Sequence, residues 1–368
     1  MSSSPIITKA VDAWVNKEIS FEEEMEDYRR HTILKILFII ACLIGVVLVA
    51  GYTLTIGDYP IGFWHSYEVL LDHLLGNPQD HTEDFIVWKV RLPRIFTGVI
   101  AGIGLAICGA VMQSILKNPL ADAYTTGVSS GASFGATLAI AAGISVVGYG
   151  GYAIVANAFI FSLIPVMVIL GVAKMRGASP VTMIMAGIAI MYVFNATTTL
   201  IKLSVSEATL ASIFDWSVGS LDNSSWQQVY IMAVFVVTGS VVMQLSSRKL
   251  NVLSTGDESA KSIGINSNRL RMICMFVVSL MAASIVSFTG MIGFIGLVCP
   301  HIVRLLIGSD NRFLIPASAA FGAVLLTASD LVGRTVIAPD IIPVGVITSF
   351  IGGPMFLWLI IKKKKEVW

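Results

Sequence analysis

Long apolar stretches separated by short polar breaks recur along almost the whole of this chain. The run from Ile95 to Leu116, for example, contains no Asp, Glu, Lys or Arg. A run of about 18 or more apolar residues without charge is typical of a transmembrane helix. We therefore expect an all-α fold of about ten membrane-spanning helices. The expected spans cover residues 33–55, 95–116, 122–143, 152–173, 180–203, 227–245, 272–288, 297–307, 313–332 and 343–361.

One uncharged segment is too long for a single crossing. Residues 272–303 contain no Asp, Glu, Lys or Arg. At about 1.5 Å per residue, a helix of that length would far exceed a bilayer core of about 30 Å. The chain must therefore turn back, and the glycine-rich segment 290–296 is the expected place. Irregular backbone at such depth requires cover from the surrounding protein.

Small residues line the second and third expected spans. Gly98 and Gly102 are four residues apart, and so are Gly127 and Gly131. This spacing puts each pair on one helix face, where neighbouring backbones can approach closely in lipid. Between the two spans, residues 117–122 form a polar break that contains Asn-Pro. The pattern predicts a helix bundle with a non-helical break near one membrane face.

Positive charge gathers on alternate sides of the expected spans. Lys and Arg flank the first span, follow the fourth, occupy residues 246–271 and close the chain at 362–365. Because basic loops stay in the cytoplasm, we expect both termini to be cytoplasmic. Residues 1–31 are then a cytoplasmic extension, and 32–368 are the transmembrane domain. Loop 56–90 lies outside, and loop 246–271 lies inside.

The composition fits a membrane protein and gives no sign of metal or nucleic-acid binding. Hydrophobic residues make up 55% of the chain and charged residues 13%, whereas soluble domains carry about 25% charged residues. A net charge of +1 does not favour a nucleic-acid partner. The four cysteines lie singly in apolar runs, which is not typical of a zinc site or a disulfide framework. His65, His73 and His81 have spacings of eight residues that match no metal-ligand motif.

No motif for chemistry by the chain itself is present. A phosphate-binding loop of the form GxxxxGK[ST] is absent from the sequence, so we expect no nucleotide site. A secondary transporter would usually need carboxylates at membrane depth, and no convincing pair is found. An intramembrane enzyme would need a converging catalytic set, which isolated His301 and Asp330 do not provide. These two classes are the alternatives to the function considered next.

Five segments resemble one known family. They are Arg91-Leu92-Pro93-Arg94, GLAICGAVMQ from Gly104 to Gln113, Asn118-Pro119-Leu120-Ala121, GVSSGA from Gly127 to Ala132, and FTGMIGFIGLVCPHIVRLLIG from Phe288 to Gly308. The last contains Gly293, Gly296, Pro300 and His301, and we expect His301 to be a hydrogen-bonded residue near a helix start. Together the segments resemble the FecCD-type permeases, which are the membrane subunits of ATP-driven importers for iron chelates, haem and cobalamin.

The resemblance implies a coupling helix in the internal loop. The segment from Gly256 to Gly264 is similar to the helix that inserts into the ATPase subunit of these importers. Its candidate residues are Gly256, Asp257, Glu258, Ala260, Lys261, Ile263 and Gly264. We expect Asp257 to cap this helix and Gly264 to end it, with Ala260 and Ile263 on one side. The alternative is a solvated loop whose basic residues only set the topology.

The resemblance also implies a docking site outside the membrane. Arg91, Arg94 and Arg334 occupy positions at which family permeases meet acidic groups of a substrate-binding protein. Exposed guanidinium groups pair with carboxylates bidentately, whereas snorkelling into solvent is the alternative. Asp330 stands four residues before Arg334, so the two side chains are expected to pair along one helix face.

The function implied is transport by alternating access. A partner ABC ATPase hydrolyses ATP, so the chain itself is expected to bind no cofactor. A homodimer, or a heterodimer with a related permease, would sit in the cell membrane, with spans five and ten lining the passage. The cargo stays open among ferric siderophore, cobalamin, haem and an oxyanion.

A weak internal repeat agrees with a transporter. Arg91-Leu92 precedes a small-residue span and then Asn118-Pro119, whereas Arg269-Leu270 precedes another span and then Cys299-Pro300. Five spans separate the two units, so they would face opposite ways across the membrane. Inverted repeats of this kind are a common way to build a transporter.

Overall fold

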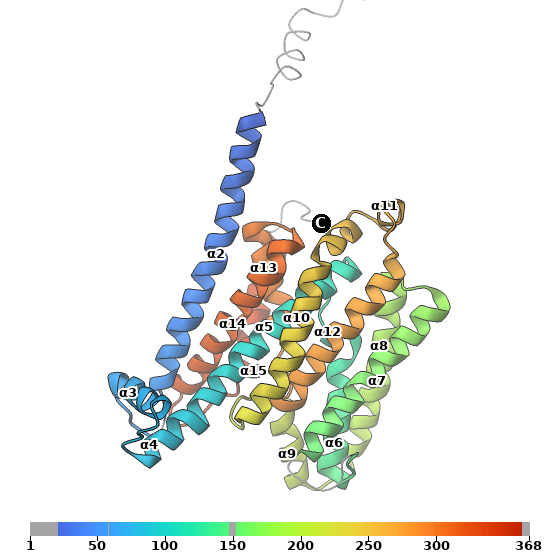
Figure 1. Ribbon diagram of the computed structural model, residues 1–368. Coiled ribbons are helices and arrows are strands. Elements are labelled where there is room, and N and C mark those ends of the chain that lie inside the picture. The colour runs from blue at the N-terminus through green and yellow to red at the C-terminus, as the bar shows by residue number, and fades with distance from the viewer. Residues whose placement is uncertain (1–20, 58, 147–151, 363–368) are drawn as a thin grey trace, which may run out of the picture.

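The computed structural model describes residues 21–57, 59–146 and 152–362, and this part of the chain contains helices but no strand (Figure 1). The helices are α2 (Phe21–Thr55), α3 (Phe63–Leu74), α4 (His81–Phe85), η1 (Ile86–Arg91), α5 (Leu92–Leu116), η2 (Tyr124–Thr126), α6 (Val128–Ala142), α7 (Ala153–Arg176), α8 (Pro180–Lys202), α9 (Glu207–Ser217), α10 (Trp226–Ser254), α11 (Asp257–Ser262), α12 (Ser267–Thr289), α13 (Ile295–Ile307), α14 (Asn311–Thr335) and α15 (Val344–Lys362).

Ten of these helices make up the bundle. Within the described residues, seven are long and apolar enough to cross a membrane: α2, α5 with the turns before it, α7, α8, α10, α12 and α14. Three shorter apolar helices, α6, α13 and the apolar part of α15, complete the set. The predicted all-α fold of about ten spans is confirmed.

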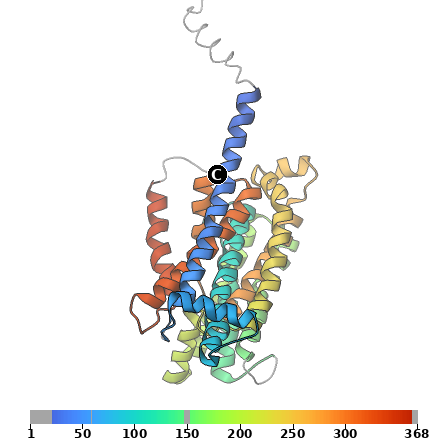
Figure 2. The same cartoon turned by 60° about the vertical axis from the view of Figure 1, so that its left-hand side comes forward.

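The bundle has two ends of different character (Figures 1 and 2). The start of α2, the short helix α11 and the end of α15 lie at one end, which we call the α11 end. Helices α3, α4 and α9 lie at the opposite end, the α9 end. This arrangement agrees with an even number of crossings between the start of α2 and the end of α15.

Helix α5 is the central element. Its apolar window is 78% buried, against 6% for α2, and it packs on α10, α12, α13 and α14. A Cβ added at Gly109 would lie 1.5 Å from the carbonyl oxygen of Gly296. At Gly102 the added atom would lie 2.4 Å from the carbonyl oxygen of Gly322. Because glycine lacks this carbon, α5 can cross α13 and α14 with its backbone in contact.

The two short helices α6 and α13 both begin after irregular backbone. Before α6, residues 117–127 are non-helical apart from the one-turn helix η2. Before α13, residues 290–294 are non-helical. The N–H of Ile292 donates to the hydroxyl of Tyr124 at 3.2 Å. A side chain from the break before α6 thus satisfies a backbone donor in the break before α13. The chain therefore turns back within the predicted segment 290–296, and protein covers the turn.

The prolines of the weak repeat occupy different environments. Pro119 lies in the break after α5, whereas Pro300 lies inside α13. Pro300 has no N–H to donate to the carbonyl of Gly296 one turn earlier. That carbonyl is the group that closely approaches Gly109. The missing helical bond and the close helix crossing therefore share one oxygen.

The predicted place of His301 near a helix start is wrong. Helix α13 begins at Ile295, so His301 lies in its middle. The side chain is buried at 7% exposure, and its ring meets that of Phe356 on α15 edge-on, with centroids 6.0 Å apart. A proline often marks the first turn of a helix, but α13 begins five residues before Pro300, which therefore lies inside the helix.

Several segments predicted to be irregular are helical. Loop 56–90 contains α3, α4 and η1, and the polar segment after α8 contains α9. Helix α10 continues to Ser254, well into the segment 246–271. Leu250 and Leu253 are fully buried there, and apolar residues three apart hold one face of a helix against the bundle. Helix α2 begins at Phe21, within the predicted extension 1–31, and continues without a break through the first span.

Candidate functional site

Helix α11 is a short, mostly exposed helix held on the bundle by one side. It runs from Asp257 to Ser262, close to the predicted limits. Gly264 follows with a left-handed φ of +84°, which favours glycine. Ala260 is completely buried, whereas Ile263 is 67% exposed. The expectation that these two residues share one exposed side is therefore wrong, since α11 packs through Ala260.

Asp257 does not cap α11 as predicted. Gly256 takes the cap position, with φ +136° and no side-chain bond. The carboxylate of Asp257 instead accepts from both terminal nitrogens of Arg271, at 2.8 and 2.5 Å. Lys117 Nζ lies 3.5 Å from the same carboxylate. The hydrogen bonds from Arg271 lower the pKa of Asp257, so the pair persists into acid below the usual range of an aspartate.

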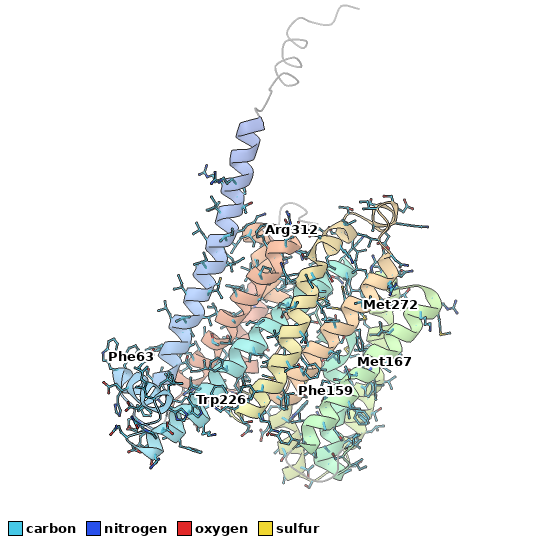
Figure 3. All side chains as sticks on the ribbon, viewed as in Figure 1. Phe63, Phe159, Met167, Trp226, Met272 and Arg312 are labelled. Carbon is cyan, nitrogen blue, oxygen red and sulfur yellow. The ribbon has the colours of Figure 1, made fainter. Side chains whose placement is uncertain are left out.

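Arg271 connects α11 to two other parts of the bundle. It is completely buried at the start of α12; the next residue, Met272, is labelled in Figure 3. Its Nε donates to the carbonyl of Ile115 at 2.9 Å, and its Nη1 donates to that of Ala178 at 3.3 Å. These carbonyls belong to the last turn of α5 and to the turn between α7 and α8. One side chain thus links α11, α5, α12 and the α7–α8 turn.

The remaining coupling candidates face solvent at the α11 end. Glu258 and Lys261 are exposed, and Gly256 is half-buried. A cavity of about 490 Å³ lies beside them, lined by Asp257, Lys261 and residues 264–268. The α11 end therefore presents a recess, and the exposed apolar residue Ile263 directly precedes its lining residue Gly264 in the chain.

Arg91 and Arg94 at the opposite end are not exposed as predicted. Arg91 is 3% exposed and donates to the carbonyls of Leu54 and Tyr59, at 2.8 and 2.6 Å. It therefore fastens the end of α2 and the following turn to η1. Tertiary packing buried this charge because carbonyl groups at a helix end were available to satisfy it.

Arg94 is the centre of a buried ion cluster. Its Nε and Nη2 donate to the carboxylate of Asp330 on α14, at 2.7 to 3.1 Å. Its Nη1 bonds Asp222, which lies between α9 and α10. The predicted pair of Asp330 with Arg334 on one helix face is replaced by this pair between helices. The cluster joins α5, α14 and the turn before α10.

Arg334 completes a cavity at the α9 end. Its Nη2 donates to the carbonyl of Ile56, and the side chain is half-buried. Arg91, Arg94 and Arg334 all line a cavity of about 380 Å³, together with the exposed side chain of Val90. The three predicted arginines are therefore brought together, although inside a recess and not on an open surface.

The other motif residues organise the break between α5 and α6. Asn118 accepts from the N–H of Leu120 at 2.9 Å through its side chain, and Pro119 follows it outside any helix. Lys117 ends α5 in the left-handed conformation, with φ 48°. Gly131 in α6 lies against α7, where an added Cβ would be 2.4 Å from the carbonyl of Phe161. Gly293 belongs to the irregular segment before α13.

The histidines of segment 56–90 join helices through carboxylates. His65 contacts Glu68 and Glu83, at 3.0 and 2.7 Å, and His73 contacts Asp84 at 2.5 Å. Because the carboxylates of Glu68 and Glu83 accept hydrogen bonds from its ring, the pKa of His65 is raised. Among the described residues, no three His, Cys, Asp or Glu side chains form a group suited to a metal ion.

Sequence reasoning missed Arg271 and Asp222 as organising residues. The sequence marks Arg271 only as one of the basic residues of segment 246–271, and no pattern marks Asp222. A weak signal existed for Arg271, because the uncharged run of α12 begins directly after it. A charge at that boundary must either reach solvent or find partners within the protein.

Comparisons with known proteins agree on one family. The model of the FecCD transport family matches residues 36–362. An ABC transporter permease protein of Methanocaldococcus jannaschii is 44% identical over 354 residues, which cover 93% of this chain and 99% of the relative. The Fe(3+)-citrate import system permease of Bacillus subtilis is 34% identical, covering 86% of this chain and 95% of its own.

The chain is also similar to a cobalamin permease and to a solved transporter structure. The cobalamin import system permease of Halobacterium salinarum is 39% identical over 280 residues, covering 76% of this chain and 74% of the relative. A solved inward-facing structure of a metal-chelate type ABC transporter superposes with a TM-score of 0.78 at 29% identity. It covers 88% of this chain and 99% of the solved chain.

Proposed function

The chain belongs to the FecCD transport family and is a permease subunit of an ABC importer, and we propose that its cargo is a metal chelate such as a ferric siderophore or cobalamin. The likeness to a metal-chelate type transporter over nearly the whole chain carries this proposal. Haem and an oxyanion are the alternative cargoes for the same scaffold. ATP is bound and hydrolysed by a partner subunit.

The α11 end is the cytoplasmic end in this proposal. Its exposed basic residues support the orientation, since positive loops face the cytoplasm. They include Lys174, Arg248, Lys249, Lys261 and Arg269. Both chain termini are then cytoplasmic, and the recess of three arginines faces outward.

Helix α11 receives the ATPase subunit. Ile263 offers an exposed apolar contact, and Arg271 ties α11 rigidly to the last turn of α5. A movement imposed on α11 would therefore reach the central helix through hydrogen bonds and packing rather than through a flexible loop. Such a contiguous connection is what coupling between distant sites requires.

The proposed apolar contact between Ile263 and the ATPase subunit can be tested by introducing a charge at this position. Ile263→Asp should lower uptake at least about ten-fold while ATP hydrolysis continues, because a carboxylate buried without a partner costs more than 1 kcal/mol. Ile263→Val, which keeps an apolar surface, should retain most uptake. Both rates would be measured in proteoliposomes that contain the permease and its ATPase. Equal behaviour of the two variants would remove Ile263 from the contact.

The recess at the α9 end receives an acidic group of a substrate-binding protein. The positive charges of Arg91, Arg94 and Arg334 lie around about 380 Å³ of space and favour an acidic partner at long range, in addition to the bonds that Arg91 and Arg94 already make within the chain. The buried bonds of Arg91 and Arg94 hold the recess in shape, so a change at either would disturb the fold as well as docking. A test must therefore use a neighbouring position.

Val90 provides that position, because it lines the recess and is 46% exposed. Val90→Glu should weaken binding of the substrate-binding protein about five- to ten-fold at low salt, through repulsion of its acidic groups. Val90→Lys has similar bulk and the opposite charge, so it should preserve or strengthen binding. Affinity to the reconstituted permease is the measurement, and an equal loss in both variants would show a steric rather than an electrostatic effect.

Two permease chains form the passage in this proposal, with α8 and α15 at their interface. Only 17% of the apolar window of α8 is buried within one chain. Met185 and Tyr192 on α8 and Phe350 on α15 are more than 60% exposed. Such faces fit either a second permease chain or lipid, and the family assembly favours the second chain.

A further inference from the structure

A deep apolar groove opens on the side of the bundle between α2 and α10. It has a volume of about 440 Å³, and its floor is formed by α5 and α14. Almost every lining side chain is apolar, with Ser240 and Gln244 of α10 as the polar exceptions. The lining residues are Ile39, Leu43, Val46, Val99, Ile103, Ile107, Ser240, Val241, Gln244, Ile315, Pro316, Ala319, Ala320 and Ala323.

The groove spans about a third of the thickness of a bilayer core. Along α5 it extends from Val99 to Ile107, and along α2 from Ile39 to Val46. At about 1.5 Å per residue these stretches span roughly 10–12 Å, which is about a third to two-fifths of a bilayer core of about 30 Å. The groove covers the middle of α2, α5 and α10 and reaches toward the α11 end along α14, which begins there at Asn311.

Two cations meet over one aromatic ring at that end. Lys35 Nζ lies 5.2 Å from the ring centroid of Phe313, and the guanidinium carbon of Arg312 lies 5.8 Å from it. Lys35 is one helical turn before Ile39, and Arg312 is three residues before Ile315, so both adjoin groove residues on their own helices. Figure 3 labels Arg312 at the α11 end of α14.

A hydrogen bond joins the groove to this charged mouth. Gln244 lines the groove and donates through its side chain to the backbone carbonyl of Arg312, at 3.0 Å. Arg312 itself pairs with Asp310 at 2.6 Å, and Asp310 also accepts from Asn251 at 2.6 Å. These contacts fix the position of Arg312, and Lys35 adds one net positive charge to the mouth.

We propose that this groove binds an anionic phospholipid, with one acyl chain in the groove and its phosphate against Lys35 and Arg312. The apolar lining excludes a polar solute, and its length accommodates part of one acyl chain. Basic pockets between membrane helices attract phosphate headgroups, and each Lys or Arg near the surface is worth about 1 kcal/mol. A bound lipid would fill the space between α2 and the central helix α5.

The test counts lipids retained by the purified full-length chain. After delipidation, the protein is incubated with phosphatidylglycerol or phosphatidylcholine of identical acyl chains, and native mass spectrometry counts the bound molecules. A headgroup arm uses glycerol phosphate alone. We expect roughly five-fold more phosphatidylglycerol than phosphatidylcholine to be retained, as about 1 kcal/mol implies, and no retention of glycerol phosphate.

Three variants locate the site. Lys35→Gln should reduce phosphatidylglycerol retention about five-fold, to the level of phosphatidylcholine. Ala319→Phe fills the groove and should reduce both lipids. Lys174→Gln removes a more exposed charge at the same end of the bundle, on α7 and away from the groove, and should change neither.

Several results would overturn the proposal. Equal retention of the two lipids by the wild-type chain, or unchanged retention in Lys35→Gln, would exclude a headgroup site at the mouth. Retention of glycerol phosphate would assign the cations to a free anion. If Ala319→Phe converts a dimer to a monomer without changing lipid retention, the groove belongs to an interface between two copies of the chain.

Discussion

At both ends of the bundle, buried arginines hold neighbouring elements together through hydrogen bonds and ion pairs. Arg94 holds carboxylates from two other elements, and Arg91 holds two backbone carbonyls. Arg271 holds one carboxylate and two carbonyls while being completely buried. A buried guanidinium is tolerated only with such partners, since removing them leaves a costly unpaired charge.

The planar fork of Arg271 is tested by Arg271→Lys. A lysine keeps the charge but cannot reach two carbonyls and both oxygens of Asp257 at once. We expect the free energy of unfolding to fall by about 2–3 kcal/mol, which is the value of a lost charged hydrogen bond or two, and uptake to fall relative to ATP hydrolysis. Thermal melting in detergent and coupled transport assays measure the two effects.

Arg269→Lys supplies the matched control. Arg269 stands two residues earlier on the same helix and is exposed. The same substitution there should leave both stability and coupling unchanged. If both variants behave alike, the hydrogen bonds of Arg271 do not carry the connection between α11 and α5.

Individual side-chain roles were the least predictable feature of the sequence. The positions of Arg91, Arg94 and Arg334 at one end followed from the pattern of spans, but their burial did not. Burial depends on Asp222, Asp330 and backbone carbonyls that come from far along the chain. Asp330 had a local candidate in Arg334, four residues away, yet it pairs with Arg94 from another helix.

At the scale of elements, close backbone crossings hold α5 in the centre. Gly109 on α5 meets Gly296 on α13, and Gly102 meets Gly322 on α14. Small residues at these points allow van der Waals contact between backbones, which is a main source of helix association in lipid. The missing helical donor at Pro300 leaves the carbonyl of Gly296 turned toward α5.

Gly109→Ala should therefore be strongly destabilising. The added methyl carbon would lie 1.5 Å from a backbone oxygen, so α13 must move away, and overpacking of this kind costs about 1–3 kcal/mol or more. Gly171→Ala on α7 is the control, because nothing lies within 4 Å of its added carbon, and alanine favours helix. Thermal melting of both variants measures the difference in stability. Similar melting temperatures would show that α5 and α13 can move apart at this crossing at little cost.

Elements were predictable where the apolar pattern is local. The spans α5, α7, α8 and α14 appear within a few residues of their expected limits, and so does α11. Helices α3 and α9 were missed because their apolar faces are short and interrupted by polar residues. The continuation of α10 was missed because Arg248 and Lys249 indicated a loop, whereas Leu250 and Leu253 pack on the bundle.

At the scale of the whole molecule, α5 joins the two ends. Arg91 and Arg94 stand at its start, next to the recess at the α9 end. Its last turn offers the Ile115 carbonyl to Arg271, which in turn holds α11. A binding protein outside and an ATPase inside would therefore act on opposite ends of one central helix. This arrangement suits alternating access, in which both partners bias the same two states.

ATP-driven uptake of a metal chelate is the central claim, and one measurement tests it most directly. Right-side-out membrane vesicles from cells with and without this gene would be given a radiolabelled ferric chelate or radiolabelled cobalamin, with internal ATP or with an ion gradient alone. An ATP-driven importer should accumulate one label in a manner that needs both the gene and ATP. Accumulation driven by the ion gradient alone, or no dependence of either label on the gene, would contradict the claim.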